Sequence, residues 1–161
     1  MSRHSAVLAA GLCLLLASLA CSLLGVTGEE ELVGSYKGTG EKTNYYFEPD
    51  KCTGPSEVTL TINRDKSVVL VAIGKGHTFG MDGCVEDPVD TAYTITGTID
   101  GLIVTFKECN GRNPANGKAT FNFSDGDLAG AAGELGCMFT NINTGEKWLE
   151  MSLTFNLVRV P

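Results

Sequence analysis

The stretch WLEMSLTFNLVRV, from Trp148 to Val160, decides the fold. Within it, apolar side chains occupy every second position from Leu149 to Leu157, and polar side chains separate them. A repeat of two residues indicates a β-strand with one buried face, not a helix. A strand of this length needs partners along its whole length, because unpaired backbone groups beside an apolar face promote aggregation. We therefore interpret it as the closing strand of a curved sheet or barrel.

Short β-type runs joined by turns fill much of the remaining chain. Val58–Ile62 and Val68–Ile73 flank the turn Asn63–Lys66, which predicts a hairpin. Asp100–Gly101 links two further runs, and an Asp-Gly link is a strong hairpin signal because both turn positions need positive φ. Ser124–Asp127 is a third predicted turn. Seven or eight such strands favour an all-β antiparallel meander that closes into a roughly eight-stranded barrel, with a β-sandwich as the alternative.

Glycine and acidic residues predict where the strands stop. Leu32–Tyr36 is the first expected strand, and Gly38 and Gly40 are expected to end it. Gly74–Val89 contains several glycines and acidic residues, and Asn110–Gly117 is rich in Asn and Gly. Both segments are therefore predicted to be loops.

The start of the chain resembles an export signal. A short basic start precedes an uncharged apolar segment from Ala6 to Val26, and small residues precede both Cys21 and Glu29. We expect cleavage before Glu29, with a retained membrane anchor or a lipoprotein cleaved at Cys21 as alternatives. The expected organisation is a secretory signal peptide over 1–28 and one all-β domain over 29–161, a length that suits a single compact domain.

Four cysteines follow this segment, and their number is even: Cys52, Cys84, Cys109 and Cys137. An exported chain with an even set of cysteines favours disulfides. A zinc site would need closely spaced pairs, and these cysteines are far apart. The predicted hairpins bring neighbours in the chain together, so we expect the Cys52–Cys84 and Cys109–Cys137 pairs among the three possible connectivities.

The charge of the chain disfavours nucleic acid as a partner. It has 12 Lys and Arg residues against 19 Asp and Glu residues, whereas phosphate binding needs a concentrated positive face. The acidic segment Asp82–Asp90 suggests calcium, but its spacing matches no EF-hand loop, and a solvated loop explains it as well. No metal site is therefore expected.

The sequence predicts neither an enzyme nor a cofactor. No Gly-x-Ser-x-Gly, His-Glu-x-x-His or phosphate-binding loop is present. His77 is the one histidine after the signal segment, and a general base needs a nucleophile and an orienting carboxylate beside it. A histidine in a glycine-rich loop is expected to be exposed and without a catalytic role.

Gly34-Ser35-Tyr36 at the head of the first strand, with Arg159 in the last one, resembles the calycin barrels, which include lipocalins and avidins. In those families a Gly-x-Trp begins the first strand and a basic residue late in the barrel packs over the Trp; here Tyr36 replaces it. The resemblance implies an eight-stranded barrel that holds one small apolar ligand. Biotin is not expected, because avidin-type pockets use several Trp residues and this chain has only Trp148.

We therefore expect a secreted barrel that binds a small, mainly apolar ligand, with four wall residues: Tyr36, Tyr93, Phe106 and Phe155. Alternation also places other side chains in the interior: Val58, Leu60, Ile62, Ile95, Leu102, Val104, Phe121, Phe123, Leu149, Met151 and Leu153. These residues would otherwise pack on each other and leave no cavity. The protein would then act through its loops as an extracellular protein-interaction or inhibitor module.

Two further features concern the surface. Asn122-Phe123-Ser124 fits the N-glycosylation pattern, and alternation points Asn122 outward. The aromatic run Tyr45–Phe47, with Trp148, forms either an exposed patch for a protein or glycan partner or a lid over one end of the barrel.

Overall fold

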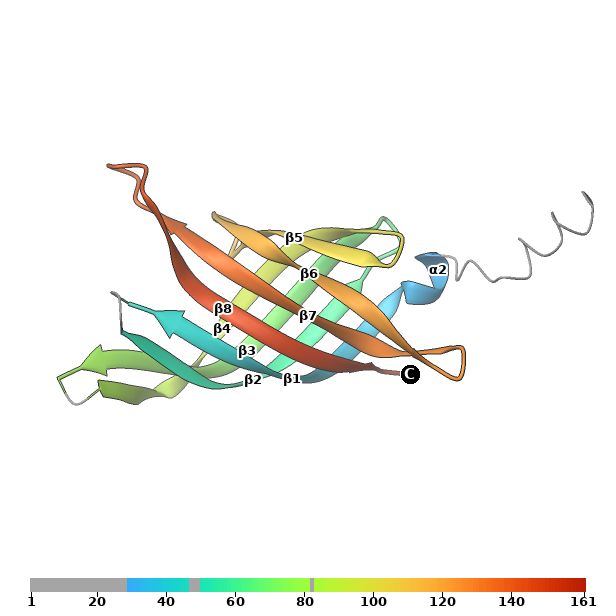
Figure 1. The fold of residues 1–161 in the computed structure, drawn as a ribbon, viewed down its shortest axis with the longest axis horizontal. Helices are drawn as coiled ribbons and strands as arrows, with labels where there is room; N and C mark the ends of the chain where they lie inside the picture. The colour runs from blue at the N-terminus through green and yellow to red at the C-terminus, as the bar shows by residue number, and fades with distance from the viewer. Residues whose placement is uncertain (1–28, 47–49, 82) are drawn as a thin grey trace, which may run out of the picture.

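The computed structural model describes residues 29–46, 50–81 and 83–161, and within them one antiparallel sheet closes on itself (Figure 1). Its strands follow chain order around a closed barrel, which confirms the predicted meander. The elements are α2 (Glu29–Leu32), β1 (Gly34–Tyr45), β2 (Lys51–Ile62), β3 (Ser67–Gly80), β4 (Gly83–Asp100), β5 (Ile103–Cys109), β6 (Asn113–Ser124), β7 (Asp127–Thr140) and β8 (Lys147–Arg159).

The last strand closes the barrel, as its alternation predicts. β8 pairs with β7 on one edge and with β1 on the other, where the register runs from Tyr36 opposite Arg159 to Asn44 opposite Met151. Every second side chain of β8 from Met151 to Leu157 is buried in the interior. Leu149 is only half-buried, because it lies where β8 leaves the barrel.

The first strand is longer than predicted and begins later. β1 continues through Gly38 and Gly40 instead of ending there. A Cβ at Gly38 would lie 2.4 Å from the Asn156 carbonyl oxygen, and a Cβ at Gly40 would lie 2.6 Å from that of Thr154. These glycines therefore let β8 approach β1 closely. Leu32 lies in α2 and not in the strand.

The two predicted loops were wrong over most of their length. The described residues of Gly74–Val89 form the distal half of a β3–β4 hairpin, whose pairing reaches Gly80 opposite Gly83. Asn110–Gly117 is largely the start of β6, which begins at Asn113. The intrinsic strand propensities of all residues differ by only about 1 kcal/mol, so the low propensity of Gly and Asp is a small cost. Pairing with a neighbouring strand outweighs it.

The predicted hairpin turns are present, one of them shifted. The turn at Asn63 is closed by a 3.0 Å hydrogen bond from the Lys66 amide to the Asn63 carbonyl. Asp100 pairs with Ile103, so the second turn is Gly101–Leu102, and Leu102 is 43% exposed instead of interior. Phe123 is also exposed, at 39%, because the β6–β7 register shifts between Asn122 and Phe123.

The cysteines form the predicted pairs. Cys52 is bonded to Cys84 and Cys109 to Cys137, with Cα–Cα distances of 5.6 and 5.9 Å. The first pair joins β2 to the β3–β4 hairpin, and the second joins β5 to β7. Both lie towards the end of the barrel opposite α2.

The two ends of the barrel differ. At one end α2 covers the interior with the buried Leu32 side chain, and the Tyr36 hydroxyl donates a 2.8 Å hydrogen bond to the Leu32 carbonyl. At the other end, which we call the mouth, the β3–β4 and β7–β8 hairpins project beyond the barrel (Figure 1). Among the described residues, no helix is long and apolar enough to cross a membrane. The predicted signal peptide lies outside the described residues.

Candidate functional site at the barrel mouth

A cavity of about 160 Å³ opens at the mouth, and we call it the mouth cavity. β1, β3, β4 and β8 supply its walls, together with the residue that follows β1. The described lining residues are mostly polar or aromatic: Asn44, Tyr45, Tyr46, Gly76, His77, Asp87, Thr91, Tyr93 and Glu150. It is therefore a small polar recess with aromatic walls.

A larger cavity of about 720 Å³ lies at the opposite end, between α2 and the β2–β3 turn. Its lining includes Glu30, Asn63 and Arg64. The mouth cavity is bounded by paired strands, and we take it as the candidate site.

Lys42 lies beneath the mouth cavity and is 0% exposed. Its ammonium donates hydrogen bonds of 3.0 Å to the Lys75 carbonyl and 3.0 Å to the Thr91 hydroxyl. A β-bulge between Lys75 and His77 interrupts the β3–β4 ladder at this point, so Lys42 supplies a donor where the ladder is irregular. A buried ammonium is costly unless its protons are bonded, and these contacts offset that cost.

Tyr93 forms the wall next to this ammonium. The Lys42 Nζ atom lies 5.6 Å from the centroid of the Tyr93 ring, within the range of a cation–π contact. Burial lowers the pKa of Lys42, and the Asp90 carboxylate partly opposes that shift. Burial raises the pKa of Tyr93 to about 12, and Glu150 and Tyr46 add to the rise. At neutral pH Tyr93 is therefore an uncharged phenol.

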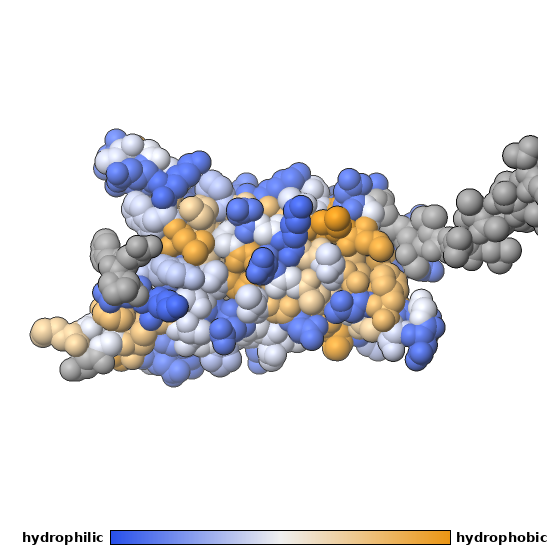
Figure 2. All heavy atoms as spheres, in the orientation of Figure 1, coloured by the Kyte–Doolittle hydropathy of each residue, from blue (hydrophilic) through white to orange (hydrophobic). Residues whose placement is uncertain are grey.

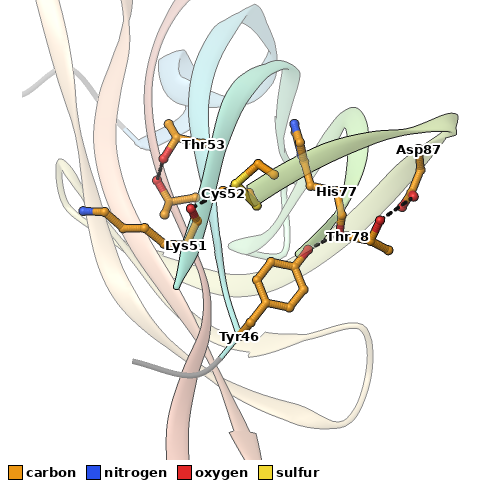
Figure 3. Close-up of a disulfide and its surroundings, with 9 residues drawn as sticks. Tyr46, Lys51, Cys52, Thr53, His77, Thr78 and Asp87 are labelled. Atoms are coloured by element: carbon orange, nitrogen blue, oxygen red, sulfur yellow. Dashed lines mark hydrogen bonds between the residues drawn. A yellow bond between two sulfur atoms is a disulfide. The ribbon is translucent and has the colours of Figure 1, made fainter. Parts of the chain in front are cut away.

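The rim of the mouth cavity is held by Tyr46 and His77. The Tyr46 hydroxyl donates a hydrogen bond to the His77 carbonyl, beside the Cys52–Cys84 disulfide (Figure 3). The His77 ring lies close to Gly54 on β2. A Cβ added to Gly54 would be only 2.9 Å from the His77 Cε1 atom, so only a glycine leaves room for the ring. Burial raises the pKa of Tyr46, and the Asp87 carboxylate raises it further.

His77 is not the exposed loop residue that the sequence suggests. It lies on β3, is half-buried, and its Nδ1 atom is buried with no hydrogen-bond partner among the described residues. An unsatisfied buried nitrogen costs about 1–3 kcal/mol.

Two carboxylates line the mouth cavity. Glu150 Oε2 accepts a 3.1 Å hydrogen bond from the Asn113 side-chain amide. Asp87 Oδ1 accepts a 3.5 Å hydrogen bond from the Thr78 hydroxyl, and Oδ2 lies over Gly76, where an added Cβ would be 2.7 Å away. No Lys or Arg is found among the described lining residues. The lining therefore carries negative charge.

Of the four predicted wall residues, Tyr93 alone lines the mouth cavity. The others are buried deeper in the core: Tyr36 packs on Phe121 at 5.6 Å between ring centroids, and Phe106 packs edge-on against Phe155 at 6.1 Å. The other predicted interior residues that are buried are Val58, Leu60, Ile62, Ile95, Val104, Phe121, Met151 and Leu153.

Sequence reasoning missed Asp87 and Glu150 as cavity residues, and it missed Lys42 as the buried residue beneath the cavity. Lys42 lies six positions after Tyr36, an even offset, so it shares the interior face of β1, as alternation dictates. That signal becomes readable only when β1 is extended beyond Gly40. Asn122 is exposed on β6, as alternation predicts, and its glycosylation stays a prediction.

The described part of the chain contains no group of three or more His, Cys, Asp or Glu residues placed to hold a metal ion. Most of the acidic segment that suggested calcium lies in β4, and Asp82 falls outside the described residues. No protein-family model matches the chain, and comparison with curated proteins found no match.

Proposed function

We propose that the protein is an exported β-barrel that binds one small ligand in the mouth cavity. The observation that carries this proposal is a recess walled by Tyr45, Tyr46 and Tyr93 above the buried Lys42 ammonium. Ligand sites are typically concave, with aromatic walls and a few placed polar groups, and the mouths of β-barrels are a common location. The closed sheet holds these groups in fixed positions.

The proposed ligand is smaller and more polar than an apolar molecule filling the whole interior. Tyr36, Phe106 and Phe155 pack on neighbouring side chains, so in this proposal they form the floor of the barrel core and not the contact surface. A volume of about 160 Å³ is below the roughly 300–1,000 Å³ of drug-sized pockets, so the ligand has on the order of ten non-hydrogen atoms.

Export and the calycin resemblance remain part of the proposal. The two disulfides favour an oxidising compartment, and exposed Asn122 is accessible for glycosylation. Tyr36 lies opposite Arg159 across β1 and β8, and the Arg159 charge partly opposes the burial that raises the pKa of Tyr36. This pairing supports a role for Tyr36 like that of the Trp in the calycin motif.

Native mass spectrometry of the protein secreted by its own or a related host tests the proposal. We expect a mass excess that disappears on unfolding and that is absent from Tyr93→Leu. It should persist in Phe123→Leu, because Phe123 is partly exposed and does not line the mouth cavity. A bare wild-type chain that also binds no compound in a small-fragment screen would overturn it. Equal uptake by the two variants would place the ligand elsewhere and would overturn the mouth cavity as its site.

The second candidate function is binding of an extracellular protein through the projecting hairpins. Met81 and Ile142, at the tips of the β3–β4 and β7–β8 hairpins, are almost fully exposed. Phe139 and Trp148 stack at 4.6 Å on the second hairpin, and both are more than a third exposed. Figure 2 shows apolar surface at the end of the β3–β4 hairpin. Contiguous exposed apolar surface marks interaction sites, and the stacked Phe139 and Trp148 rings form such a surface.

One pair of variants separates the two functions. Met81→Ser with Ile142→Ser removes apolar area from the hairpin tips without touching the mouth cavity, and Tyr93→Leu does the reverse. If the hairpins carry the function, the first variant loses partner binding and keeps any bound ligand. If Tyr93→Leu loses partner binding while the Met81→Ser, Ile142→Ser variant keeps it, binding through the hairpins is contradicted.

A further inference from the structure

We propose that the ligand of the mouth cavity is a small organic cation, an amine whose ammonium lies near Asp87 and Glu150 and whose apolar part packs on the tyrosine rings. This inference rests on the proposed function and names its ligand class. Three features of the cavity support the inference: the negative charge of the lining, the tyrosine walls, and the burial of the nearest lysine, Lys42, outside the lining.

The charge of the lining selects the sign of the ligand. Asp87 and Glu150 both line the cavity, and no Lys or Arg does so among the described residues. Burial is the main cause of the raised pKa values of Tyr46 and Tyr93, and the Asp87 carboxylate adds to the first and the Glu150 carboxylate to the second. A ligand carboxylate or phosphate would be repelled by these two carboxylates, whereas an ammonium would be attracted to them.

The nearest lysine does not reverse this argument. Lys42 is 0% exposed and already donates to the Lys75 carbonyl and the Thr91 hydroxyl. The Thr91 and Tyr93 side chains line the cavity, whereas Lys42 does not. Its acceptors are uncharged, so its positive charge remains and offsets part of the negative charge of the two lining carboxylates. Its position beside the Tyr93 ring shows that this ring accepts a cation.

The aromatic walls suit an ammonium with an apolar substituent. Tyr45, Tyr46 and Tyr93 line the same small space, and aromatic faces attract cations through their quadrupole. Asn113 orients the Glu150 carboxylate and Thr78 contacts that of Asp87, so neither acceptor has to be ordered entirely by the ligand.

Isothermal titration with three matched probes tests this inference: phenethylamine, 2-phenylethanol and 3-phenylpropionate. They share a phenyl ring and a short chain and differ in charge. We expect phenethylamine to bind about tenfold or more tighter than the alcohol, and the acid to bind weakest, because charge-assisted hydrogen bonds are the stronger ones. Affinity for the amine should fall by about tenfold in Glu150→Gln and in Asp87→Asn.

Glu57→Gln is the matched control, because it removes the same charge from an exposed position on β2. It should leave the affinity for the amine within about twofold. Thermal unfolding of each variant verifies that the fold is retained. Equal affinities for the amine and the alcohol, or equal losses in Glu57→Gln and Glu150→Gln, would overturn the cation assignment.

The outcomes also separate this inference from the proposed function. If the alcohol or the acid binds best and Tyr93→Leu abolishes that binding, the mouth cavity is a ligand site and the cation assignment is wrong. If no probe binds and the secreted protein carries no mass excess, both proposals fail. If the amine binds best and Tyr93→Leu, Asp87→Asn and Glu150→Gln each weaken it, both stand.

Discussion

The Lys42 ammonium lies 5.6 Å from the centroid of the Tyr93 ring and thereby connects β1 to β4 across the interior of the barrel. Two hydrogen bonds fix it, one to the Lys75 carbonyl on β3 and one to the Thr91 hydroxyl on β4. The base of the projecting β3–β4 hairpin is therefore attached to the first strand. The predictions below follow from this attachment and from the packing around it.

Replacing Lys42 tests the attachment. Lys42→Met keeps most of the side-chain volume but leaves the Lys75 carbonyl and the Thr91 hydroxyl without this donor. We expect the free energy of unfolding to fall by about 1–3 kcal/mol, measured by urea denaturation. Lys37→Met, at an exposed position of the same strand, should change it by less than about 0.5 kcal/mol. Equal effects of the two variants would contradict a bonded, buried ammonium.

Ionisation of Tyr93 makes stability depend on alkaline pH. Its pKa is about 12 in the fold, against about 10 in an unfolded chain. Between these values the folded state holds the proton and the unfolded state does not, so stability falls as pH rises from about 10 to about 12. Spectroscopic titration of tyrosinate should show a step near 12 that Tyr93→Phe removes. Ionisation of all four tyrosines near pH 10 would contradict the burial of Tyr93.

Lys42 gives a pH effect of the opposite sign. Its pKa is lowered from the ordinary value of 10.5, so below that value the unfolded state binds the proton more tightly. Stability should rise as pH increases through the folded-state pKa of Lys42 towards 10.5. Denaturant midpoints measured across this window should show the rise in the wild type and its loss in Lys42→Met. A rise of the same size in Lys42→Met would assign the effect to another group.

Gly38 on β1 allows the close approach of β8, and replacing it tests that contact. In Gly38→Ala the new Cβ would lie 2.4 Å from the Asn156 carbonyl oxygen, so β1 and β8 must separate. We expect a loss of about 1–3 kcal/mol in the free energy of unfolding. Gly80→Ala is the control, because nothing lies within 4 Å of its added Cβ. An equal, small effect at both positions would contradict the close approach of the closing strand.

The Cys52–Cys84 disulfide should matter for both stability and the mouth cavity. The disulfide joins two cysteines that are 32 positions apart in the chain, and it anchors the β3–β4 hairpin beside Tyr46 and His77. Replacing both cysteines with Ala should lower the free energy of unfolding by about 3–4 kcal/mol. It should also weaken ligand binding, measured by titration. Full ligand affinity in a folded double variant would show that the disulfide does not position the rim.

Alternation and turn chemistry predicted the closing strand, the main hairpins and the disulfide pairs. They did not predict that β1 runs past Gly38 and Gly40, because a glycine that ends a strand and one that admits a neighbouring strand look alike in sequence. Lys42 was missed for the same reason. In sequence a lysine is normally assigned to the solvent-facing side of a strand. The buried position of Lys42 is recognised only when the full length of β1 and the β-bulge at Lys75, whose carbonyl accepts its hydrogen bond, are known. The acidic β3–β4 hairpin resembled a loop because cross-strand pairing is not a local property.

Mapping of backbone amide shifts by NMR, on adding the amine probe, tests the central claim most directly. If the mouth cavity is the ligand site, the largest shifts will lie at Tyr46, His77, Tyr93 and Glu150, with little change around α2. Shifts confined to the cavity beside α2, or to the hairpin tips near Met81 and Ile142, would contradict it.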